Sequence, residues 1–71
     1  MTSHQQRIAA LQRHLKALPA EQEQVDVKIL AELFDLTIFV ARRVVLFSGR
    51  RPTEENEEFF AKAEDVTVKV T

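Results

Sequence analysis

Positive charge is the most concentrated functional chemistry of this sequence, and it lies on two pairs of adjacent arginines, Arg42–Arg43 and Arg50–Arg51. They give residues 36–52 a local charge of +4, although the whole 71-residue chain has a net charge of −1. Concentrated positive charge attracts a phosphate backbone or an acidic protein surface equally well. The arginines therefore indicate a binding surface for one of two kinds of partner, DNA or protein.

The sequence shows no set of residues for catalysis, for a cofactor or for a metal ion. It has no cysteine and no glycine-rich phosphate loop, and no nucleophile, base and acid stand in a known pattern. His4 and His14 are too far apart to share a helical turn, and no carboxylate or cysteine accompanies them. We therefore expect a protein that is not an enzyme and that holds no cofactor or metal.

Length and composition predict one small soluble domain over residues 1–71. The chain is 45% apolar and 30% charged, which separates it from disordered and membrane proteins. The lack of cysteine and of a signal-peptide pattern near Met1 leads us to expect a cytoplasmic location. A core in so short a chain seldom supplies more than about 3–5 kcal/mol, so self-association as a homodimer is expected.

The first element is predicted to be an amphipathic helix over residues 3–18. Ser3 and Gln6 have the spacing of a capping box, and Pro19 ends the helix. The apolar residues of its stripe recur at helical spacing and are Ile8, Leu11, Leu15 and Leu18. This stripe is expected to pack on the remainder of the same chain.

Residues 27–46 are predicted to form two helices joined by a short turn. Thr37 is the expected N-cap of the second helix, and Asp35 stands in the turn, where it tolerates a left-handed conformation. Ala31 is small enough for the closest approach of two helices that cross steeply. Gly49 is expected to end the second helix in the left-handed region.

The C-terminal part is predicted to be a fourth helix followed by a strand. Thr53 can cap a helix from Glu54 to about Glu64. Val66, Val68 and Val70 then alternate with polar residues, as in a half-buried strand over residues 66–70. Such a strand needs a partner, which is either segment 25–27 or the equivalent strand of a second chain; we favour the second, a dimer ribbon.

A helical wheel of the second motif helix divides its side chains between two faces. The inward face is expected to carry Val40, Ala41, Val44, Val45 and Ser48. The outward face is expected to carry Ile38, Phe39, Arg42, Arg43 and Leu46. Aromatic residues beside arginine are typical of protein-binding anchors, whereas an arginine-bearing helix that enters the major groove is typical of DNA readers.

The stretch over residues 25–45 resembles the DNA-binding headpiece of the lactose-repressor family. The shared pattern is V-x-x-x-x-x-A-E-x-x-x-x-[ST]-x-x-x-x-x-R-V-V, and the matching residues are Val25, Ala31, Glu32, Thr37, Arg43, Val44 and Val45. The resemblance covers 21 of the 71 residues. It implies a helix-turn-helix motif over residues 27–46 and a small regulator that binds double-stranded DNA, as bacterial repressors and phage-switch proteins do.

The resulting prediction is a mainly α, helix-turn-helix-like domain of about four helices with a short C-terminal β-strand. Its expected function is transcription regulation as a dimer on DNA. The alternative is a protein-interaction module or inhibitor that binds a regulatory protein target through the outward face. The residues predicted to contact either partner are Thr37, Ile38, Phe39, Arg42, Arg43, Leu46, Arg50 and Arg51.

Overall fold

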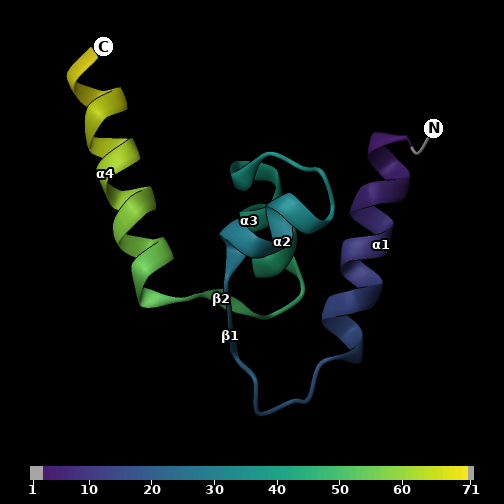
Figure 1. Cartoon of the computed structure of the whole chain (residues 1–71). Helices are drawn as coiled ribbons and strands as arrows, with labels where there is room; N and C mark the ends of the chain where they lie inside the picture. The colour runs from purple at the N-terminus through teal and green to yellow at the C-terminus, as the bar shows by residue number, and fades with distance from the viewer. Residues whose placement is uncertain (1–2, 71) are drawn as a thin grey trace.

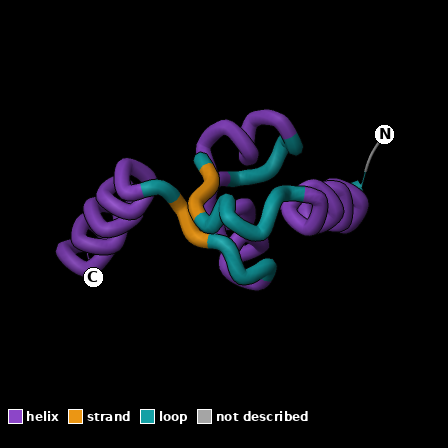
Figure 2. The backbone as a smooth tube through the Cα atoms, turned by 90° about the horizontal axis from the view of Figure 1, so that it is seen from below, coloured by secondary structure: helices purple, strands orange, loops and turns teal. Residues whose placement is uncertain are grey.

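The computed structural model describes residues 3–70, and it describes side chains for residues 3–63. In chain order, the elements are α1 (His4–Ala17), β1 (Gln24–Val25), α2 (Val27–Leu33), α3 (Ile38–Phe47), β2 (Arg51–Pro52) and α4 (Glu54–Val70). Both views place α2 and α3 between α1 and α4 (Figures 1 and 2). The described chain is therefore mainly helical, as the sequence predicts.

Helix α1 begins with the capping box that its sequence predicts. The Ser3 hydroxyl accepts from the backbone N–H of Gln6 at 3.1 Å, and the Gln6 side chain accepts from the Ser3 N–H at 2.9 Å. Two of the donors that a helix start leaves without partners are satisfied in this way. The helix ends before Pro19, and Leu11 and Leu15 are its fully buried side chains.

Two short strands form a parallel ladder in which Gln24 pairs with Arg51 and Val25 with Pro52. The Arg51 N–H donates to the Glu23 carbonyl at 2.8 Å, and the Thr53 N–H donates to the Val25 carbonyl at 3.1 Å. Pro52 has no N–H to donate, but the ladder needs no donor at its position. The ladder joins the entrance of α2 to the exit of α3.

The turn between α2 and α3 is fixed by a left-handed residue and a cap. Asp35 has φ of 53°, and the following Leu36 N–H donates back to the Ala31 carbonyl at 2.9 Å. This closes α2 in a Schellman arrangement, with Asp35 where glycine is usual. Thr37 then accepts from the Val40 N–H at 3.2 Å and starts α3. Both predicted roles, of Asp35 and of Thr37, are confirmed.

Helix α3 ends in the same manner at Gly49. Gly49 has φ of +79°, its N–H donates to Leu46, and the Arg50 N–H donates to the Val45 carbonyl, both at 3.1 Å. A β-carbon would disfavour this backbone conformation, although there is open space around Gly49. The predicted end of α3 at Gly49 is therefore confirmed, and the chain reverses into β2.

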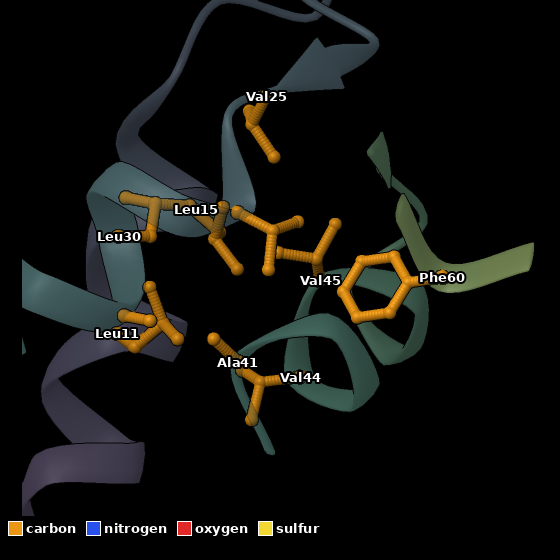
Figure 3. Close-up of a cluster of buried hydrophobic side chains, with 10 residues drawn as sticks. Leu11, Leu15, Val25, Leu30, Ala41, Val44, Val45 and Phe60 are labelled. Carbon is orange, nitrogen blue, oxygen red and sulfur yellow. The ribbon is translucent and has the colours of Figure 1, made fainter. Parts of the chain in front are cut away.

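The core lies where α1, α2 and α3 meet, with one aromatic side chain added from α4 (Figure 3). Ala31 and Ala41 are buried small residues on α2 and α3, and they permit close contact between the helices. The buried apolar residues are Leu11, Leu15, Val25, Val27, Leu30, Ala31, Ala41, Val44, Val45 and Phe60. The predicted stripe of α1 does pack within the chain.

The predicted C-terminal strand over Val66, Val68 and Val70 is wrong. The backbone there is helical, because α4 runs without a break from Glu54 to Val70. An alternation of β-branched residues over a few positions gives only a weak preference for a strand. A helix already begun extends at little cost, because each further residue adds a hydrogen bond. Segment 24–25 pairs with β2 instead, so the basis for an intermolecular strand ribbon is removed.

Asn56 is the buried polar link between α4 and the entrance of α2. Its side chain is 2% exposed, and its Oδ1 accepts from the Val27 N–H at 2.6 Å. The Thr53 hydroxyl accepts from the Asn56 backbone N–H at 3.4 Å, as expected of the cap of α4. A donor at the first turn of α2 is thereby satisfied by a residue 29 positions away.

Replacing Asn56 by alanine should lower the free energy of unfolding by about 1–3 kcal/mol, because the buried Val27 N–H would lose its acceptor. Urea denaturation followed by circular dichroism measures this change. Glu55→Ala, at the exposed neighbouring position of the same helical turn, is the control and should change stability by less than about 0.5 kcal/mol. Equal stability of the Asn56→Ala protein and the parent would contradict the assigned link.

Candidate partner-binding surface

The outer side of α3 carries an exposed row of large side chains, which we call the α3 ridge: Phe39, Arg43, Leu46 and Phe47. Phe39 is 57% exposed, Leu46 44% and Phe47 82%. Phe39, Arg43 and Leu46 follow one another at spacings of four and three residues, so they stand in line along the helix. The structure thus places three predicted outward residues on one surface and adds Phe47.

Toward α4, the ridge is bordered by an aromatic and cationic contact. The rings of Phe39 and Phe60 meet edge to face, with centroids 5.8 Å apart. The Arg42 guanidinium lies over the Phe60 ring at 5.0 Å, beside a hollow that Glu57 and Ala61 also line. Arg42 is half-buried here, and its Nε atom is covered without a hydrogen-bond partner among the described residues. Arg42 is thus committed mainly to holding α4 on α3.

Toward α1, the ridge borders an apolar hollow of about 290 Å³. Its apolar lining comes from α1 and α3, and its rim carries a histidine and an arginine. The lining residues are His4, Ile8, Gln12, Val40, Arg43, Val44 and Phe47. No carboxylate belongs to this lining, so the hollow suits an apolar group with negative charge next to it.

Arg50 was expected to contact a partner, but the structure uses its guanidinium within the chain. Nη1 donates to the carbonyls of Pro19 and Gln22 at 2.8 and 2.6 Å, and Nη2 donates to those of Leu15 and Leu18 at 3.2 and 3.1 Å. These carbonyls belong to the end of α1 and the loop after it, where helix geometry leaves acceptors without partners. This placement corrects the expectation that Arg50 contacts a partner. With four acceptors in the chain, its guanidinium acts as a clamp on the end of α1.

Arg51 also has a partner in the chain, although a weaker one. Its Nη2 lies 3.5 Å from Glu23 Oε2, and both side chains are largely exposed. Such an exposed pair contributes little to stability and can exchange for another partner. Arg43, by contrast, makes no hydrogen bond, ion pair or ring contact with the described part of the chain. It is the predicted arginine best placed to meet an external group.

The remaining predicted contact residues divide between the surface and the interior. Thr37 is exposed, but its hydroxyl is engaged in capping α3. Ile38 was expected to point outward, whereas it is half-buried and packs against the core. The wheel left out Phe47, although it follows Arg43 by four residues and therefore lies one turn above it. That spacing is the signal that could have identified Phe47.

No protein-family model, curated protein or solved structure matches this chain. Within the described residues, no helix combines the length and the apolar character needed to cross a membrane. The same residues contain no group of three or more histidine, aspartate or glutamate side chains placed to hold a metal ion.

Arg50→Ala should lower the free energy of unfolding by about 2–3 kcal/mol. The substitution removes the hydrogen bonds that a charged donor makes to four carbonyls, and such bonds stabilise more than bonds from neutral donors. Arg51→Ala, which removes only an exposed ion pair, is the matched control and should cost less than about 1 kcal/mol. Thermal unfolding monitored by circular dichroism compares the two. If both variants melt like the parent, the clamp is not what holds the end of α1.

Proposed function

We propose that this protein is a small protein-interaction module that binds a partner protein through the α3 ridge. Three large apolar side chains stand exposed around Arg43, which has no partner among the described residues. Phe39, Leu46 and Phe47 offer the aromatic and aliphatic surface that is enriched at protein-binding anchors. Arg43 adds a charge that can pair with a carboxylate of the partner.

The placement of the other arginines favours a protein partner over DNA. Arg50 donates to backbone carbonyls, Arg42 lies on the Phe60 ring, and Arg51 lies beside Glu23. A DNA reader needs several side chains directed at phosphates, and phosphate contacts supply most of its affinity. Arg43 is the main charge of this surface that has no partner among the described residues. The surface therefore suits an apolar interface with a protein better than it suits a DNA backbone.

DNA binding, as in a helix-turn-helix repressor, is the second candidate. It is favoured by the local geometry of residues 27–47, in which a short turn joins two helices and Thr37 caps the second. Arg43 is exposed at a position that the resemblance to repressor headpieces includes. As part of either proposal, we place the protein in the cytoplasm, a reducing compartment that suits a chain without cysteine.

A gel-shift titration with duplex DNA of mixed sequence, repeated at increasing salt, separates the two candidates. The proposal predicts weak binding that Arg43→Ala hardly changes. A DNA regulator would instead bind tightly at low salt, and Arg43→Ala would reduce the salt slope by about one unit for the lost phosphate contact.

Arg13→Ala is the matched control for this titration, because Arg13 is an exposed arginine on α1, away from the α3 ridge. Tight, salt-dependent DNA binding that is lost in Arg43→Ala and kept in Arg13→Ala would contradict the proposed protein-binding function. The far-ultraviolet circular dichroism spectrum of each variant shows whether it is folded before binding is compared.

A further inference from the structure

We infer that the partner of the α3 ridge is a second copy of this chain, bound across a two-fold axis. The inference rests on the proposed function, because it names the partner of the same surface. In this dimer the two α3 ridges face each other, and α1 of one protomer lies over the first turns of α4 of its partner. An interface of this kind uses the same patch on both copies.

The placement of the helices is the first argument. Helices α1 and α4 lie on opposite sides of the α2–α3 pair in both views, so they do not meet within one chain (Figures 1 and 2). A two-fold axis that runs along the α3 ridge exchanges these sides, whereas an axis that runs from α1 toward α4 would place each helix opposite its own copy. With the axis along the ridge, α1 of each protomer lies opposite α4 of the other, which gives two equivalent contacts.

The charges on these two helices are the second argument. Helix α1 contains no acidic residue and three basic ones: Arg7, which lies 3.8 Å from Asp35 Oδ2, and the exposed Arg13 and Lys16. The first turns of α4 carry four exposed glutamates, namely Glu54, Glu55, Glu57 and Glu58. None of these glutamates forms an ion pair among the described side chains. The symmetric pairing therefore brings opposite charges together in two places.

In the proposed dimer, the partner's α4 also covers the hollow between α1 and α3. Its apolar lining and its rim residues His4 and Arg43 lie on the α1 side of the ridge. In the two-fold arrangement this side faces the partner's α4, whose first turns supply carboxylates. Arg43, at the rim of this hollow, would then have carboxylates of opposite charge on the partner's α4.

The size of the chain is compatible with a dimer interface of standard size. The chain measures 38 × 33 × 17 Å, and a standard interface buries about 800 Å² on each partner. The total exposed surface is 5423 Å², so such an interface takes a minor part of it. Helix α2 also exposes two large apolar residues, Ile29 and Leu33.

Sedimentation equilibrium of the full chain from micromolar to millimolar concentration tests the inference. The parent should dimerise, and Phe47→Ser should raise the dissociation constant by about tenfold or more, since it removes an apolar anchor. Leu33→Ser, an equally exposed apolar site on α2, is the matched control and should leave the constant unchanged. Circular dichroism verifies that both variants are folded.

A charge-exchange experiment tests the crossed pairing of α1 with α4. One variant carries Arg13→Glu and Lys16→Glu, and the other carries Glu54→Lys, Glu57→Lys and Glu58→Lys, so that α1 of the first and the first turns of α4 of the second each change the sign of their charge. Each variant alone should dimerise more weakly than the parent, because α1 and α4 then carry the same charge. An equimolar mixture should recover dimers, because both crossed pairs are again of opposite charge.

A parent that stays monomeric at millimolar concentration would overturn the second copy as partner. Loss of dimers in Leu33→Ser with no effect of Phe47→Ser would overturn it as well, because the interface would lie on α2. Neither result would contradict the proposed protein-binding function. DNA binding that depends on Arg43 would overturn that function, and the inference with it.

Discussion

The guanidinium of Arg50 is the interaction on which the arrangement of this small protein most depends. It donates to four carbonyls at the end of α1 and in the following loop, while its own backbone N–H closes the end of α3. One residue thereby fixes the C-terminal end of α1 relative to the C-terminal end of α3. The positive charge also favours the negative end of the α1 dipole. The clamp helps to hold α1 beside α3, and these two helices line the hollow that borders the α3 ridge.

The parts of the fold that the sequence predicts correctly depend on neighbours within a few residues. Asp35, Thr37 and Gly49 fix the start or the end of a helix through backbone groups three to five positions away. Such caps follow from residue type and spacing alone, because the required conformation is local. The buried faces of α1 and α3 follow from helical periodicity for the same reason. The candidate surface was predictable to this extent: Phe39, Arg43 and Leu46 point outward, as a wheel requires.

The parts that could not be predicted depend on residues that are distant in the chain. The acceptors of Arg50 lie 28 to 35 positions before it, so the arginine had the appearance of a surface charge. Arg42 was likewise expected to be available, because nothing near it in sequence indicates that Phe60 lies beneath it. The strand expected over residues 66–70 failed differently, since α4 continues through a segment whose alternation favoured a strand. The hydrogen bonds gained by extending a helix already begun outweighed a weak local preference for a strand there.

In the arrangement proposed here, the outer side of α3 is a protein-binding surface whose partner is a second copy of the chain. Amide chemical shifts of the ¹⁵N-labelled protein, followed as its concentration is raised, test this claim most directly. Concentration-dependent shifts should gather along residues 39–47 and on the facing parts of α1 and of residues 54–63. Ile29 and Leu33 on α2 should stay unchanged. Shifts centred on α2, or spectra that do not change up to millimolar concentration, would contradict it.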